Sequence, residues 1–301
     1  MIALPKFSAP PKPQTTRAMG LDPILALALL AVSLWPTWRW LAARLEDSGE
    51  EAWGIIGLLG TVLVVLNNRI GSLSDIDRLR TTDRRMGWLP ILATILYAAS
   101  YPFLSPLPRA LIALTALGTL LPSLVLRRNA AVHAAGFLFL SLPVMPSLQF
   151  YLGYPLRVVS GEVAARLINA SGFPVVRNGT LLSWQDRLVF IDAPCSGVKM
   201  LWAGMVLALA LSALRGHGPL RTLAMAAAAL FAVIAANILR TTALFFLETG
   251  VVQGPPWAHS AIGMSAFLSA AALVVWIDRT RRPSHAVPPQ TSTLEPTPCA
   301  A

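Results

Sequence analysis

Three side chains that could together perform acyl transfer stand at the ends of apolar segments. Cys195 precedes one long apolar segment, Arg240 stands near the end of the next, and His259 opens the last. A thiolate is a strong nucleophile, and a helix N-terminus or a nearby cation lowers the pKa of a thiol. An imidazole moves protons near neutral pH, and a guanidinium can hold an oxyanion. The set predicts Cys195 as nucleophile, His259 as acid and base, and Arg240 as the stabiliser of thiolate or oxyanion.

Each of these residues also has an ordinary structural explanation. A single cysteine is usually a small hydrophobic residue, an arginine near a helix end often extends its charge to the membrane surface, and His259 could be an interfacial polar residue. The predicted depths favour the functional interpretation, because polar residues inside membrane helices are costly. A rise of about 1.5 Å per residue carries Arg240 from Arg221 most of the way across a membrane. Arg240 thus reaches the level of Cys195 and His259.

Three further residues near this set have predicted supporting roles. Ser196 and Gly197 begin the apolar segment after Cys195, so their backbone N–H groups could help to hold an oxyanion. Asn237 stands three positions before Arg240 and therefore on the same helix face. Its amide could bind Arg240 or the substrate, or it could satisfy a contact between helices.

Two acidic residues could act on this set from its edges. Asp192 could cap the helix after Cys195 or orient His259. Glu248 could pair with Arg240 across the end of its helix. We expect no cofactor and no metal ion, because the outward-facing acidic residues show no spacing typical of metal ligands.

The composition places these residues in a membrane protein. Of 301 residues, 55% are hydrophobic and 13% are charged, about half the charged fraction of a soluble globular chain. The formal net charge of +10 does not predict nucleic-acid binding, because the Lys and Arg residues stand at the ends of apolar runs. This placement is the one that orients membrane helices.

The apolar runs predict an all-α polytopic membrane protein with about eight transmembrane helices, each needing roughly 20 mostly apolar residues. The second and third runs are short, and Pro143 and Pro146 break the fifth. The expected spans are 23–41, 52–66, 86–102, 107–126, 130–151, 196–214, 220–247 and 258–277.

The distribution of basic residues predicts the orientation of these helices. With the N-terminus inside, the inner segments hold fifteen Lys and Arg residues, whereas the short outer loops hold Arg39, Arg44 and Arg109. Both termini should therefore be cytoplasmic, and the cysteine should face outward. We expect a disordered N-terminus at 1–20, an integral membrane domain at 21–280 that starts with an uncleaved signal anchor, and a disordered tail at 281–301.

The long outer loop, 152–194, carries a pattern of its own. Apolar residues at helical spacing in 156–169 predict an amphipathic helix at the outer surface. The pair Asn178-Gly179, between β-rich runs at 173–177 and 180–183, predicts a type I′ hairpin, and a third run follows at 188–191. These elements could form the floor or lid of a groove for an extended peptide, or they could only cover the mouth of the bundle.

Three short motifs resemble those of a known family. Asp192-Ala-Pro-Cys195-Ser196-Gly197 resembles the Cys-Ser-Gly signature of the exosortase and archaeosortase family, although many members have Ala-Cys in place of Ala-Pro-Cys. Asn237-Ile-Leu-Arg240 is similar to its Asn-x-x-Arg motif, and His259-Ser-Ala-Ile-Gly263 to its His motif. The order and the helix placement also match, over roughly residues 20–280.

The resemblance implies a membrane-embedded cysteine protease or transpeptidase of the bacterial cytoplasmic membrane. Its partners would be secreted proteins whose C-terminal sorting tail holds a Pro-Glu-Pro-like motif, one transmembrane helix and a basic cluster. Many members of the family occur in bacteria that make exopolysaccharide. Carried over to this chain, Cys195 is the nucleophile, Arg240 the stabiliser and His259 the acid and base.

Two other functions remain open at this point. A non-enzymatic component of polysaccharide or lipid export would have polar residues at mid-membrane depth and broken helices of repeat origin, and the sequence has no convincing internal repeat. An acyl- or glycosyltransferase acting on lipid-linked substrates would need a carboxylate cluster or a metal site.

Overall fold

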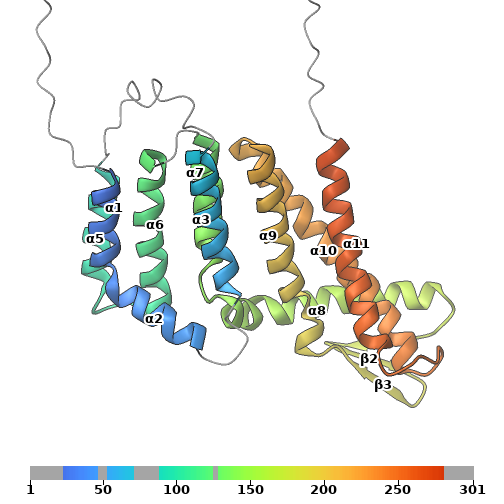
Figure 1. Ribbon diagram of the computed structural model, residues 1–301. Helices are drawn as coiled ribbons and strands as arrows, with labels where there is room; N and C mark the ends of the chain where they lie inside the picture. Colours follow the sequence, from blue (N-terminus) through green and yellow to red (C-terminus); the bar gives the residue numbers. More distant parts are fainter. Residues whose placement is uncertain (1–22, 47–52, 71–87, 125–127, 281–301) are drawn as a thin grey trace, which may run out of the picture.

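The computed structural model describes residues 23–46, 53–70, 88–124 and 128–280, and these ranges are mostly helical (Figure 1). In chain order the elements are α1 (Pro23–Ser33), α2 (Trp35–Glu46), α3 (Gly54–Ile70), α5 (Leu89–Ser100), α6 (Pro106–Leu124), α7 (Arg128–Leu140), α8 (Met145–Ala170), β1 (Val176–Asn178), β2 (Leu181–Trp184), β3 (Arg187–Phe190), the 3₁₀ turn η1 (Ala193–Ser196), α9 (Val198–Arg215), α10 (Pro219–Glu248) and α11 (Ala258–Thr280).

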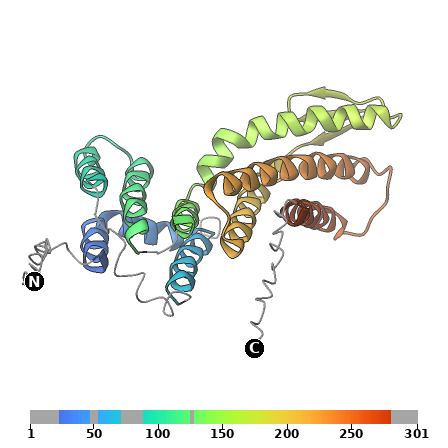
Figure 2. The ribbon, with the colours of Figure 1, turned by 90° about the horizontal axis from the view of Figure 1, so that it is seen from above.

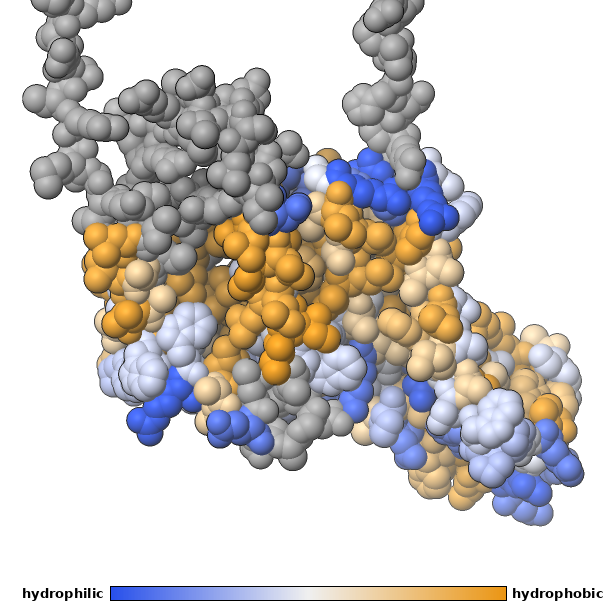
Figure 3. Space-filling model, viewed as in Figure 1, coloured by the Kyte–Doolittle hydropathy of each residue, from blue (hydrophilic) through white to orange (hydrophobic). Residues whose placement is uncertain are grey.

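Most of the helices stand side by side in one layer, and their apolar side chains cover its outer surface. Figure 1 shows α1, α3, α6, α7, α9 and α11 running up and down through this layer, with α2 and α8 lying across its lower edge. The space-filling view shows an apolar band over the same helices, with hydrophilic residues above and below it (Figure 3). This arrangement is that of a membrane protein, because the apolar band faces lipid and the polar edges face water.

Three of the described helices are long and apolar enough to cross a membrane, namely α9, α10 and α11. A fourth span is possible if α7 and α8 count as one pair, but they are bent by 85°. The helices α3, α5 and α6 are apolar over shorter stretches. The predicted count of eight spans therefore remains a prediction.

Two predicted spans are wrong in shape. The span expected at 23–41 is divided into α1 and α2, with Pro36 in the first turn of α2, where its missing N–H costs nothing. The span expected at 130–151 ends with α7 at Leu140, and the chain turns through 85° before α8. Pro143 and Pro146 lie at this break, as the sequence indicated.

The surface helix expected at 156–169 is the second half of α8. This helix runs without interruption from Met145 to Ala170, with Pro155 inside it. Seen from above, α8 lies alongside α10 over most of its length (Figure 2). The irregular loop is therefore shorter than predicted, and α8 forms a wall beside α10.

The three strands form an antiparallel sheet in the order β1-β2-β3. Asn178 pairs with Leu181, so Gly179 and Thr180 are the central residues of the first turn, one position later than predicted. Of the two, Gly179 alone has positive φ, at 60°, which excludes the predicted type I′ turn. The sheet packs through Leu182 and Val189 onto buried residues of α8 and α10. The sheet thus contributes to a small apolar core, against which Cys195 is packed.

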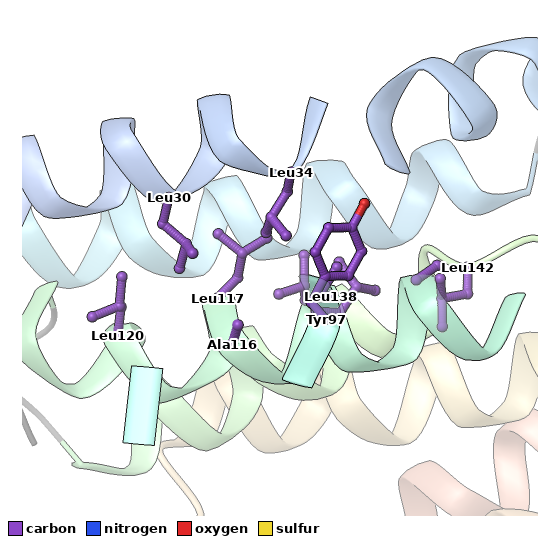
Figure 4. Close-up of a cluster of buried hydrophobic side chains, with 11 residues drawn as sticks. Leu30, Leu34, Tyr97, Ala116, Leu117, Leu120, Leu138 and Leu142 are labelled. Carbon is purple, nitrogen blue, oxygen red and sulfur yellow. The ribbon is translucent and has the colours of Figure 1, made fainter. Parts of the chain in front are cut away.

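The N-terminal helices have a separate core of buried leucine and alanine side chains. Leu30 and Leu34 belong to one buried cluster with Leu117 and Tyr97 (Figure 4). The Tyr97 hydroxyl bonds the Thr37 hydroxyl at 2.9 Å, which satisfies both polar groups away from water. None of the predicted site residues belongs to this half.

The ends of α9, α10 and α11 farthest from the sheet share a buried group of charges, here called the basic end. Asp278 is fully buried, and one of its oxygens lies 2.9 Å from Arg215 Nη1. Its other oxygen lies 3.3 Å from His217 Nε2 and 3.7 Å from Arg221 Nη2. A buried carboxylate without partners is strongly destabilising. These contacts therefore hold the three helices in register at one end.

Candidate active site

Cys195 lies in the short 3₁₀ turn η1, between the sheet and α9. Its N–H donates to the carbonyl of Asp192 at 2.9 Å. The N-cap of α9 is Gly197, so Cys195 precedes the helix. The carboxylate of Asp192 makes no capping hydrogen bond to η1, and it is not the cap of α9. The prediction that Asp192 caps this helix is therefore wrong.

Gly197 allows the chain to turn sharply from Cys195 into α9. Its φ is +81°, in the left-handed region that favours glycine. A Cβ at this position would lie 2.9 Å from Cγ of Asn237, which is closer than real Cβ contacts allow. The turn is thus shaped both by the backbone of Gly197 and by the side chain that fills the space beside it.

Asn237 holds the backbone of the cysteine turn from α10. Its amide nitrogen donates to the carbonyl of Cys195 at 3.2 Å and to the hydroxyl of Ser160 on α8 at 3.1 Å. The side chain is 2% exposed, so these bonds form away from water, where they are strongest. Of the predicted alternatives for Asn237, the structure shows a contact between helices that positions Cys195.

Ser196 is held by a residue that the sequence analysis did not select. Its hydroxyl donates to Gln149 Oε1 at 3.0 Å, and the amide nitrogen of Gln149 donates to the carbonyl of Ala193 at 2.5 Å. Gln149 belongs to the first turns of α8. Its polar side chain inside a predicted span was a usable signal, because such residues need a partner.

The Cys195 thiol is half-buried against the apolar core of the sheet, to which Val189 and Phe245 belong. Burial raises the pKa of Cys195 above its ordinary value, because a thiolate is poorly solvated there. The charge of Arg240 opposes this rise, while Glu248 and Asp192 add to it. The expected lowering of the pKa does not occur, since burial outweighs the opposing charge of Arg240.

Arg240 lies on α10, one turn after Asn237, and packs against Gly263 of α11. A Cβ on Gly263 would lie 3.4 Å from Arg240 Nε, so the guanidinium covers this glycine. Nε is buried and makes no hydrogen bond within the described part of the chain. Arg240 also lines a groove of about 310 Å³ between α10 and α11. The guanidinium therefore lies between α10 and α11, and its charge acts on the Cys195 thiol.

His259 stands in the first turn of α11, where its Nδ1 lies 3.5 Å from Oε1 of Glu248. Glu248 is the last residue of α10, so the pair joins the ends of two consecutive helices. From the sequence, Asp192 could cap the helix after Cys195 or orient His259, and Glu248 could pair with Arg240. The structure instead places Glu248 against His259, and Asp192 acts on Cys195 through its charge.

The structure therefore gathers the predicted residues at one end of α9, α10 and α11, here called the cysteine end: Asp192, Cys195, Ser196, Gly197, Asn237, Arg240, Glu248 and His259. The fold and this group define a helical membrane protein with a thiol, a guanidinium and an imidazole–carboxylate pair at one edge of its apolar layer.

The family follows from comparison with known proteins. A family model described as transmembrane exosortase matches residues 18–276. The chain therefore belongs to the transmembrane exosortase family, as the three motifs indicated. No curated protein and no solved structure matches it.

Proposed function

We propose that this chain is a membrane-embedded cysteine transpeptidase or protease that cleaves the C-terminal sorting signals of secreted proteins. One observation carries the proposal: Cys195 lies within range of the Arg240 charge, at the same end of the helices as the Glu248–His259 pair. Membership of the exosortase family supports it. The site thus offers a nucleophile, an oxyanion partner and a proton carrier.

In the proposed first step, the Cys195 sulfur attacks the scissile carbonyl carbon of the sorting signal. Because burial holds the pKa of Cys195 high, the resting thiol is protonated and needs a base. His259 accepts the thiol proton, and the guanidinium of Arg240 stabilises the oxyanion. When the C–N bond breaks, His259 gives the proton to the leaving amine, and a thioester on Cys195 remains.

In the second step, a nucleophile attacks the thioester carbonyl and restores the thiol. Water as nucleophile gives hydrolysis, and an amine gives transpeptidation. In both cases the incoming nucleophile loses a proton to His259, and the departing sulfur of Cys195 regains one. The same three side chains serve both steps, as microscopic reversibility requires.

The charges of the basic end support a cytoplasmic position for that end and an outer position for the cysteine end. Arg215, Arg221 and Arg279 gather at the basic end of α9, α10 and α11, and basic residues favour the cytoplasmic side. The cysteine end lies at the opposite end of the same helices (Figure 1). We propose that it faces outward from the bacterial cytoplasmic membrane, where it meets the sorting tail after translocation.

A single substitution tests the proposal. Cys195→Ala should reduce processing of a secreted protein with a matching sorting tail by roughly 100-fold or more, while the variant accumulates in the membrane at the normal level. The matched control is Cys299→Ser, which changes the other cysteine of the chain and should process normally. Processing of the tail reads out by immunoblot. Normal processing by Cys195→Ala would favour the non-enzymatic export component.

The proposed orientation has its own test. A maleimide that cannot cross the cytoplasmic membrane should label Cys195 in intact cells of the Cys299→Ser variant. Labelling that appears only after the membrane is broken would place the cysteine end in the cytoplasm.

A further inference from the structure

Glu248 occupies a position that is electrostatically unfavourable for a carboxylate. It is the last residue of α10, where the helix dipole presents its negative end. Its side chain is 38% exposed and lies between the end of α10 and the beginning of α11. The other residues of the last turns of α10 are apolar or hydroxylated, from Thr241 to Leu247. A charge at this point therefore needs a partner outside its own helix.

That partner is His259. Its Nδ1 lies 3.5 Å from Glu248 Oε1, across the connection between α10 and α11. The other charged groups around the pair are Arg240 on α10, Asp192 before η1, and Arg187 of β3, whose guanidinium lies beside Gly250. Of these, Arg240 and Asp192 act on the thiol of Cys195, as Glu248 itself does. The imidazole and the thiol thus share one carboxylate.

We propose that Glu248 is a positioning residue for His259. This rests on the function proposed above. A carboxylate facing Nδ1 favours the tautomer in which Nδ1 carries the hydrogen, which leaves Nε2 free to accept a proton. When Nε2 takes the proton from the Cys195 thiol, the imidazole becomes a cation and Glu248 stabilises it. Glu248 keeps its own charge throughout, so the only proton that moves passes from sulfur to Nε2 and then to the leaving amine.

The same carboxylate opposes ionisation of the thiol when His259 is neutral. The negative charge of Glu248 raises the pKa of Cys195. A thiolate therefore forms at the cysteine end together with an imidazolium, and a free thiolate is disfavoured at rest. The protonated thiol reacts slowly with other electrophiles. It becomes reactive when a bound substrate lets the thiol proton pass to His259.

This role predicts two effects of opposite sign from one substitution. In Glu248→Gln, processing of the sorting tail should fall by roughly 10-fold to 100-fold, because the tautomer and the imidazolium lose their support. With His259 replaced by Ala, so that no imidazolium can form, Glu248→Gln should make alkylation of Cys195 by iodoacetamide at neutral pH faster, because a charge that raises the thiol pKa is gone. A carboxylate that only joins α10 to α11 would lower processing by the same factor with or without the His259 side chain.

The experiment uses the full chain, with processing measured in cells and alkylation measured on the purified protein in detergent. Glu248→Asp should recover part of the processing. The matched control is Glu162→Gln, which changes a carboxylate of α8 that pairs with Arg166 and Arg177. In a His259→Ala background, Glu248→Gln should cause no further loss of processing.

Wild-type processing in Glu248→Gln, or an additive loss in the double variant, would overturn the role of Glu248. Slower alkylation of Cys195 in the Glu248→Gln, His259→Ala double variant than in His259→Ala alone would also overturn it. If Cys195→Ala processes normally, the proposed function itself fails. The two failures are therefore distinguishable.

Discussion

The two ends of α9, α10 and α11 use charged residues in opposite ways. At the basic end, Asp278 is fully buried and meets Arg215, His217 and Arg221 at 2.9 to 3.7 Å. At the cysteine end, Glu248 and His259 lie 3.5 Å apart, and their side chains are 38% and 46% exposed. The first arrangement places a buried carboxylate among basic side chains, whereas the second leaves a carboxylate and an imidazole partly exposed.

Two hydrogen bonds at the cysteine end hold the backbone of the cysteine turn. Asn237 holds the carbonyl of Cys195, and Gln149 holds that of Ala193. The described structure leaves Arg240 Nε buried without a partner. Neighbouring side chains therefore hold the cysteine turn in place, while His259 has a partly exposed contact with Glu248. The comparison predicts that substitutions at the basic end change stability and that those at the cysteine end change activity.

The largest effect is expected from Asp278→Ala. Removing this carboxylate leaves Arg215 and Arg221 without their buried counter-charge, which typically costs about 3–5 kcal/mol. The variant should accumulate poorly in the membrane and lose thermal stability in detergent. Arg279→Gln, an exposed charge one residue further on, is the control and should accumulate normally. Normal accumulation of Asp278→Ala would show that the basic end does not hold the helices together.

Two glycines with positive φ, one at each end of α9, sharpen the comparison. Gly197→Ala would bring a Cβ within 2.9 Å of the Asn237 side chain, whereas a Cβ on Gly216 meets nothing within 4 Å. Both variants strain the backbone by about 1 kcal/mol. Only Gly197→Ala should displace the support of Cys195 and lower processing, by roughly 10-fold at constant accumulation. Equal processing by the two variants would contradict the positioning role of Asn237.

The sequence indicated the cysteine end better than it indicated the fold around it. Cys195, Arg240 and His259 were placed at one depth by counting residues along apolar helices, and this works because a membrane span fixes depth. The contacts of Asn237 and Gln149 depend on how α8 crosses α10. That crossing follows from the bend between α7 and α8, whose angle no local pattern determines.

The pKa of Cys195 shows a different limit. The pattern of a cysteine before a helix and an arginine nearby predicts a lowered value. The sheet core that buries the thiol comes from residues that meet it only in the folded chain, such as Val189 and Phe245. Glu248, the last residue of α10, comes near Cys195 only when the helices pack together. Burial and charge together reverse the expected direction.

A smaller pair of effects should appear in the reactivity of the thiol. The charge of Arg240 lowers the pKa of Cys195, and that of Asp192 raises it. Arg240→Gln should therefore move the pH dependence of alkylation to higher pH, and Asp192→Asn should move it to lower pH. Iodoacetamide labelling of the purified protein across a pH series measures both. Shifts in the same direction would mean that the two charges do not act on the thiol as the structure indicates.

The smallest expected effect is the pH dependence of the basic end. Burial lowers the pKa of His217 below its ordinary 6.5, and Arg221 and Arg215 lower it further against the opposing charge of Asp278. His217 therefore takes up a proton less readily in the folded protein than in the unfolded chain. The free energy of unfolding should fall as the pH drops below the ordinary pKa of histidine. Thermal unfolding in detergent should begin at a lower temperature at about pH 5.5 than at about pH 7.5. In His217→Gln this difference should be smaller, and an undiminished difference would assign the pH effect to other groups, such as the neighbouring His133.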